Sequence, residues 1–136
     1  SFPTRRSSDL AGQPVSAEVN LPLHRKIPRY VMEFSDGQRI EVKSRCGAGR
    51  MPPTAEDGYE AFAVLHDSSQ QTSRRHFEFG VTAIGQVWVM DCDSANGTWL
   101  ESHGSRIELP KLTRTSMVPG DVLRFGGMRA KLVQVS

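Results

Sequence analysis

Apolar and polar residues alternate with a period of two along much of the chain after Pro28, and this pattern restricts the possible folds most strongly. Successive side chains of a β-strand point to opposite faces, so the alternation predicts half-buried strands. The alternating apolar positions are Tyr30, Met32 and Phe34, then Ile40 and Val42, then Phe77 and Phe79, and finally Met128, Ala130 and Leu132. No segment carries a convincing helical stripe. Many short strands of this kind predict an all-β sandwich or barrel.

Turn-forming residues and polar stretches separate the predicted strands. Asp36-Gly37 and Asn96-Gly97 are each expected to form a hairpin turn, because glycine adopts positive φ without strain. The apolar run Gln86–Cys92 precedes the second of these turns and is predicted to be a strand. Two polar stretches rich in turn formers, Met51–Glu60 and Leu100–Thr115, are predicted to be long surface loops.

The bulk properties of the chain predict one ordinary globular domain. Residues 1–28 hold four prolines and no periodicity, so we expect a flexible arm or linker there and a single domain over residues 29–136. The formal net charge of +2 is too small to indicate a nucleic-acid or membrane partner by itself. No apolar run approaches the roughly 18 residues that cross a bilayer, and no secretory signal is present, so we expect a cytoplasmic location.

The sequence offers no recognisable catalytic or metal site. It contains no G-x-S-x-G, H-E-x-x-H or P-loop pattern, and nothing places a base beside a nucleophile. Cys46 and Cys92 have no metal-ligand spacing and are expected to be reduced structural thiols. We therefore expect a protein that is not an enzyme and that needs no cofactor.

Four segments place polar residues beside predicted strands: Gly47–Arg50, Thr72–His76, Asp93–Trp99 and Val118–Gly126. Arginine provides a planar, permanently charged fork suited to phosphate, and a serine hydroxyl can donate to a further phosphate oxygen. An asparagine side chain can both donate to and accept from the backbone of an extended peptide. Two predicted strands separate Ser73 from Asn96, so their loops should share one end of the sandwich. Spacing alone does not place Arg50 there.

Taken in order, these segments resemble the signature of the forkhead-associated (FHA) domain family over about residues 29–135. The matching residues are Gly49-Arg50, Ser73-Arg74-x-His76, Asn96-Gly97-Thr98 and Gly120-Asp121-x-Leu123-x-Phe125-Gly126. The resemblance implies an FHA-like β-sandwich of about eleven strands that binds phosphothreonine peptides on the loops at one end. It also implies a phosphothreonine-containing partner protein and a Ser/Thr kinase that acts upstream in a signalling pathway.

The resemblance further implies a role for each matching residue. Ser73 and Arg74 would hold the phosphate, Arg50 would support the phosphate and the adjacent peptide backbone, and Asn96 would fix the peptide backbone. The structural support of the site would come from Gly49, His76 and Gly97. The segment Gly120–Gly126 would form a late strand and turn of the fold.

The chain departs from the family pattern at Ala95, where a threonine or serine is frequent, and at Thr72, where an apolar residue is frequent. These departures leave the peptide preference open. An FHA-like domain that binds partners without phosphate is therefore an alternative. A nucleic-acid-binding domain is a further alternative, and it would use Arg74, Arg75, Arg124 and Arg129.

Overall fold

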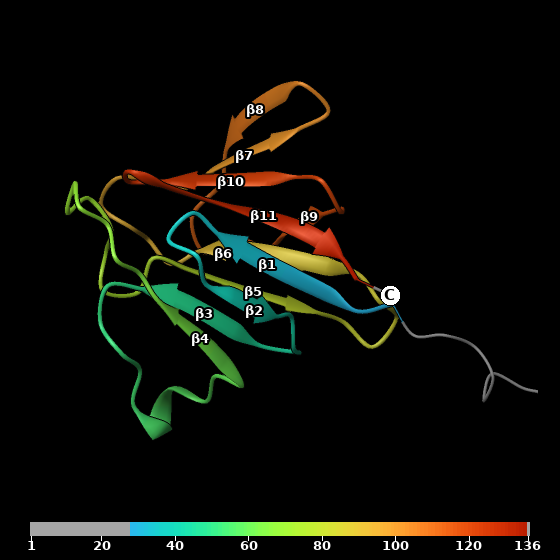
Figure 1. Ribbon diagram of the computed structural model, residues 1–136, viewed down its shortest axis with the longest axis horizontal. Helices are drawn as coiled ribbons and strands as arrows, with labels where there is room; N and C mark the ends of the chain where they lie inside the picture. Colours follow the sequence, from blue (N-terminus) through green and yellow to red (C-terminus); the bar gives the residue numbers. More distant parts are fainter. Residues whose placement is uncertain (1–27, 136) are drawn as a thin grey trace, which may run out of the picture.

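The computed structural model describes residues 28–135, which form two β-sheets packed face to face (Figure 1). The predicted all-β sandwich is therefore confirmed. Apart from Pro28, the predicted N-terminal arm lies outside the described residues. The strands are β1 (Tyr30–Phe34), β2 (Arg39–Glu41), β3 (Cys46–Gly49), β4 (Ala61–Val64), β5 (Phe77–Val81), β6 (Val87–Asp91), β7 (Trp99–Ser102), β8 (Ser105–Glu108), β9 (Thr115–Met117), β10 (Val122–Phe125) and β11 (Met128–Gln134).

A single turn of 3-10 helix, η2 (Ala55–Asp57), interrupts the loop from β3 to β4. No α-helix occurs between residues 28 and 135. Within the same range, no helix has the length and apolar character that crossing a bilayer requires.

The two sheets differ in strand order. The six-stranded sheet has the order β2-β1-β11-β10-β7-β8, and the five-stranded sheet has the order β4-β3-β5-β6-β9. Neighbouring strands are antiparallel except β3 and β4, which run parallel. Because β3 and β4 run in the same direction, the chain must cross back between them, and the segment with η2 makes this connection.

The core lies between the sheets and follows the predicted alternation. Met32 and Phe34 of β1 and Phe77 and Phe79 of β5 are buried, as is Leu132 of β11. Four phenylalanine rings from both sheets form the centre of the core, with centroids 4.9–6.4 Å apart: Phe34, Phe77, Phe79 and Phe125. Rings at these separations contribute edge-to-face attraction in addition to their burial. In β1 and β11, for example, the alternation in the sequence specifies which face of the strand turns inward.

One predicted turn is confirmed and one is corrected. Gly37 has φ +95° and joins β1 to β2 as a hairpin. Gly97 also has positive φ, at +83°, but the strands on either side of it belong to different sheets. The Asn96-Gly97 hairpin prediction was therefore wrong. A turn residue sets the local backbone direction, whereas the pairing of the flanking strands depends on which sheet buries them.

The prediction of a loop over Leu100–Thr115 was also wrong, because this stretch contains the β7–β8 hairpin and the start of β9. All four residues of β8 are exposed, so this edge strand has no apolar face and gives no alternating signal. Its turn falls at His103-Gly104, where both residues have positive φ. The other predicted loop, Met51–Glu60, is irregular apart from η2.

Candidate functional site

Four connections meet at one end of the sandwich, on the left in Figure 1: the β3–β4, β4–β5, β6–β7 and β10–β11 turns. The β4–β5 loop is organised by Asp67, whose carboxylate accepts hydrogen bonds from the amides of Ser69 and Gln71. The same carboxylate lies 3.4 Å from the amide nitrogen of Gly127 in the β10–β11 turn. Asp67 thereby joins the β4–β5 loop to the neighbouring turn.

Ser73 connects this loop to the next. Its hydroxyl oxygen accepts a 3.0 Å hydrogen bond from the amide of Ala95 in the β6–β7 loop. Asn96 makes a second link, because its side-chain Nδ2 donates to the carbonyl of Gln71 over 2.9 Å. The predicted meeting of the Ser73 and Asn96 loops is confirmed by these two contacts.

Arg50 is brought to the same place by the end of β3. Its amide donates to the carbonyl of Ser73 over 2.9 Å, and its Nε lies 3.3 Å from the carbonyl oxygen of Thr72. The preceding Gly49 makes this approach possible, since a Cβ at this position would lie 2.0 Å from the backbone oxygen of Arg74. A glycine is therefore required where β3 passes the Ser73–Arg74 segment.

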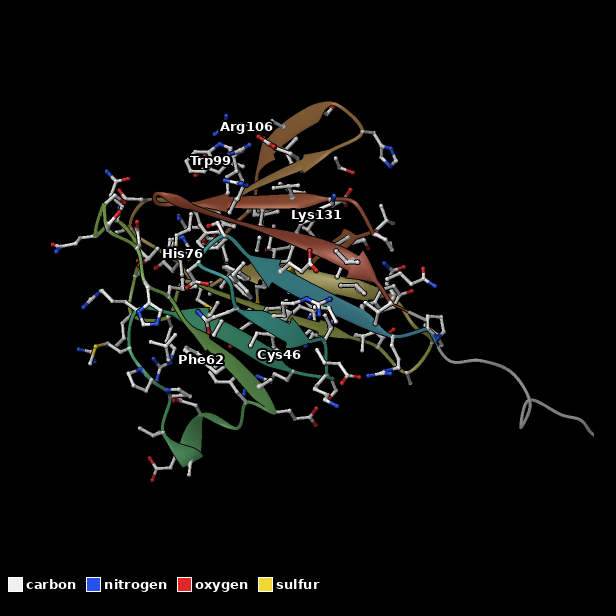
Figure 2. All side chains as sticks on the ribbon, in the orientation of Figure 1. Cys46, Phe62, His76, Trp99, Arg106 and Lys131 are labelled. Atoms are coloured by element: carbon white, nitrogen blue, oxygen red, sulfur yellow. The ribbon has the colours of Figure 1, made fainter. Side chains whose placement is uncertain are left out.

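His76 lies beneath these loops and is completely buried. Its Nδ1 accepts a 3.0 Å hydrogen bond from the amide of Ser73, so this nitrogen carries no proton. The proton of the neutral ring then resides on Nε2, which donates to the carbonyl of Gly97 over 2.9 Å. The ring also packs on Phe125 with a centroid separation of 5.6 Å. One neutral imidazole thus joins both loops to the aromatic core. Figure 2 labels His76 among the side chains of the sandwich.

Burial lowers the pKa of His76 below its ordinary value, and the hydrogen bond to Gly97 and the charge of Asp91 offset this only in part. Protonation would also place a hydrogen on Nδ1, where the Ser73 amide now donates. The neutral form is therefore the one that fits the site.

A buried carboxylate shapes the β6–β7 loop, and the sequence analysis did not identify it. Asp91 is completely buried and accepts hydrogen bonds from the amide and hydroxyl of Ser94 and from the hydroxyl of Thr98. The Lys111 ammonium lies 3.4 Å from it. Burial raises the pKa of Asp91, but the Ser94 and Thr98 hydrogen bonds and the Lys111 charge together lower it below its usual value. An aspartate at a strand end, followed by serine and threonine in a short loop, was the available signal.

The loops enclose an open depression of about 610 Å³ at this end of the molecule. It is lined by Arg50, Gln70, Gln71, Thr72, Ser73, Arg74, Ala95 and Asn96. The four residues predicted to contact ligand all lie in this lining, which holds two arginines and no carboxylate. The three predicted supporting residues, Gly49, His76 and Gly97, are not part of this lining. The depression can therefore accept an anion.

Neighbouring residues of the motif are used differently. Arg75 turns away from the depression and pairs with Asp57 of η2 at 2.7 Å, so it is not part of the anion site. Thr72 is buried, and its hydroxyl has no hydrogen-bond partner among residues 28–135. An apolar side chain would serve equally well at this position.

Burial raises the pKa of the Cys46 thiol to about 11 and that of Cys92 to about 12, which makes both poor nucleophiles at neutral pH.

The sequence model of the FHA domain matches residues 60–126. This stretch of the chain matches the FHA domain family. The matched stretch includes Ser73, Arg74 and Asn96, whereas Arg50 precedes it. FHA domains are protein-interaction modules. No curated protein matches the chain closely enough in sequence to be recognised as a relative.

Solved FHA domains share the fold of this chain. The FHA domain of an Arabidopsis thaliana hypothetical protein is 22% identical, covers 80% of this chain and 87% of that one, and has a TM-score of 0.59. The FHA domain of the CT664 protein from Chlamydia trachomatis is 19% identical over 79% of this chain and 99% of its own, also with a TM-score of 0.59. The MEK1 FHA domain, in complex with a phosphothreonine peptide of HOP1, is 21% identical over 79% and 97%, with a TM-score of 0.59.

Replacing Asp91 with asparagine should destabilise the domain by about 2–4 kcal/mol, because the amide nitrogen cannot accept the hydrogen bonds that the carboxylate now receives. Urea unfolding measures this cost. Thr72→Val is the matched control at a buried hydroxyl without a described partner, and it should not reduce the free energy of unfolding. Equal stability of Asp91→Asn and the wild type would show that the buried carboxylate does not hold the loop.

The lowered pKa of His76 predicts that stability falls as the pH is lowered through about 6.5, the ordinary histidine value. Below this value the unfolded chain binds a proton that the folded chain does not, so the free energy of unfolding decreases until the folded-state pKa is reached. The slope cannot exceed about 1.4 kcal/mol per pH unit for one group.

Urea unfolding between pH 7.5 and 5 tests this, with His66→Gln as the control at an exposed histidine. The free energy of unfolding of His66→Gln should fall with pH as in the wild type. That of a folded His76→Gln variant should not show this fall. A wild-type stability that stays flat over this range would contradict the prediction by itself.

Proposed function

We propose that this FHA domain binds phosphothreonine-containing peptides of a partner protein, and so joins the two proteins when a Ser/Thr kinase has phosphorylated the partner. The proposal assigns the phosphate to Ser73, Arg74 and Arg50, and the peptide backbone to Asn96. It assigns no catalysis and no cofactor to the domain. It also places the interaction in the cytoplasm, where such kinases act.

The observation that carries the proposal is the state of the Ser73 hydroxyl. Its oxygen already accepts a hydrogen bond from the Ala95 amide, and it donates to no other residue between 28 and 135. A hydroxyl has one proton to donate. The Ser73 proton is thus available to an acceptor in the depression, beside two guanidinium groups. This combination suits a phosphate oxygen.

The charges of the depression favour a dianion. Arg50 uses only its Nε towards Thr72, and the Arg74 side chain has no acidic partner in the described part of the chain. A phosphorylated threonine carries between −1.5 and −2 charges at neutral pH and three acceptor oxygens. Two unpaired guanidinium groups can neutralise this charge with hydrogen bonds stronger than neutral ones.

Asn96 is placed to hold an extended peptide. Its side chain donates to the carbonyl of Gln71, which fixes the amide plane at the rim of the depression. The side-chain oxygen then remains as an acceptor for a peptide amide. Ala95 donates to Ser73 through its backbone amide. This contact therefore does not need the threonine or serine side chain that is frequent at this position in the family.

The phosphorylated form of a peptide should bind far more tightly than the unphosphorylated form, reaching about micromolar affinity from two or three charge-assisted hydrogen bonds of about 1.5–3 kcal/mol each. Arg50→Ala, Ser73→Ala and Asn96→Ala should each weaken binding about tenfold or more and leave the fold intact, because they lie on surface loops and Ser73 and Asn96 each lose only one inter-loop hydrogen bond. His76→Ala should lower both affinity and melting temperature.

Calorimetry with phosphorylated and unphosphorylated versions of one peptide measures the difference in affinity between the two forms. Arg39→Ala, on an edge strand of the six-stranded sheet, is the control for removing a surface arginine. Equal affinity for the two peptide forms would exclude the proposal and favour an interaction that does not depend on phosphate.

Phosphothreonine should bind more tightly than phosphoserine in the same peptide. The two residues carry the same charge, so the arginines cannot distinguish them. Burying the additional methyl group contributes about 0.8 kcal/mol, which corresponds to about fourfold. The more restricted χ1 of threonine reduces the entropy lost on binding and can raise the preference to about a hundredfold. Competition titrations that found identical affinities would show that the site only clamps phosphate.

A further inference from the structure

Strand β8 (Ser105–Glu108) is an edge of the six-stranded sheet, and the candidate site does not use it. All four of its residues are exposed, and Figure 1 shows the β7–β8 hairpin at the top of the molecule with no described segment beyond it. An edge of this kind presents unpaired backbone groups to which another strand can bind. Natural edges are often protected by lysine, proline or a β-bulge, and β8 contains none of these.

Two residues of β8 direct their backbone groups to the free side. The amide of Leu109 donates to the carbonyl of Thr98 over 2.8 Å, and hydrogen-bonded and non-hydrogen-bonded pairs alternate along an antiparallel ladder. Ile107 is therefore the next residue that is bonded to β7. Arg106 and Glu108 alternate with the bonded residues, so their N–H and C=O groups point away from β7. A strand that adds to this edge must bond to these two residues.

The side chains of Arg106 and Glu108 share one face of β8 and have opposite charges. Arg106 makes only a 3.9 Å ion pair with Glu101, which Arg124 contacts more closely at 2.6 Å. Glu108 has no ion pair within residues 28–135. Ile107, between them, is 50% exposed on the other face. Opposite charges two residues apart on one face complement the same strand running in the reverse direction.

We propose that β8 binds β8 of a second copy of this chain, antiparallel and about a two-fold axis at Ile107. The registers that use the free backbone groups place Arg106 and Glu108 opposite one another or opposite themselves. Arg106 opposite Arg106, or Glu108 opposite Glu108, would destabilise the pairing by juxtaposing like charges. Arg106 opposite Glu108 of the second copy forms an attractive pair on each side of the axis, as the symmetry requires. This register also brings the two Ile107 side chains together.

The opposite edge of the same sheet explains why the inference concerns β8 and not β2. Strand β2 has the same three residues in the same order, Arg39-Ile40-Glu41. Arg39 already pairs with Glu33 at 3.0 Å, and Glu41 pairs with Arg29 at 3.2 Å. Ile40 packs against the core. The charges and the apolar side chain of β2 are thus used within the chain, whereas those of β8 remain available to a second copy.

The pairing would make the domain bivalent. A two-fold axis at β8 reverses the strand direction, so the phosphate depressions of the two copies would face opposite ways. One short peptide could not then occupy both depressions. Resting on the proposed function, the dimer would join two phosphorylated partner molecules, and it would bind a multivalent partner more tightly than one copy does.

Exchange of charges tests the pairing, by sedimentation equilibrium of the 136-residue chain without any peptide. The interface is small, so we expect a weak dimer with a dissociation constant on the order of 0.1–1 mM. Arg106→Glu and Glu108→Arg should each raise this constant about tenfold or more, because each variant places like charges opposite each other. An equimolar mixture of the two variants should recover the dimer, since their edges are then complementary. Arg39→Glu, at the matched position of β2, should dimerise like the wild type.

Four results would overturn the inference. These are a wild-type chain that stays monomeric up to roughly 1 mM, a dimer that persists in both single variants, a mixture that remains monomeric, and growth into open chains. The last result would indicate that β8 of one copy pairs with β2 of the next, because a head-to-tail contact does not close. The test contains no phosphopeptide, so its failure leaves the proposed function intact. Equal affinity for phosphorylated and unphosphorylated peptide would reject that function and leave the dimer standing.

Discussion

The arrangement of the site depends on the two hydrogen bonds of the His76 ring. One nitrogen accepts from the Ser73 amide and the other donates to the Gly97 carbonyl, so a single buried side chain holds both loops that line the depression. Because the ring also packs on Phe125, the position of the loops is tied to the aromatic core between the sheets. The site is therefore set by the folding of the core, and a ligand need not order it.

The change of sheet between β6 and β7 explains why the β6–β7 loop needs so much internal support. The chain leaves the five-stranded sheet at Asp91 and enters the six-stranded sheet at Trp99, so no ladder of strand hydrogen bonds holds the residues between them. The buried Asp91 carboxylate replaces that ladder by accepting from Ser94 and Thr98. Hydrogen bonds to a buried charge are stronger than neutral ones, so this carboxylate can fix the loop that carries Asn96.

The sequence predicted the parts of this structure that depend on local pattern. Alternation identified β1, β2, β5 and β11, and the strand count between Ser73 and Asn96 correctly placed their loops together. It could not place Arg50, because the close packing of Gly49 on Arg74 is a contact between segments far apart in the chain. It missed β8 because that edge strand has no buried face. It missed Asp91 because the local signal, an aspartate followed by serine and threonine, does not by itself show that the carboxylate is buried.

The tautomer of His76 is the most direct test of this account, and a long-range nitrogen–proton NMR correlation of the imidazole at neutral pH measures it. We expect one fixed neutral form of the ring in the free domain, with the proton on Nε2 and with Nδ1 as an acceptor. The same form should persist when a phosphothreonine peptide is added. A ring protonated on Nδ1, or one that exchanges between tautomers until peptide binds, would contradict the claim that His76 holds the loops in place in advance.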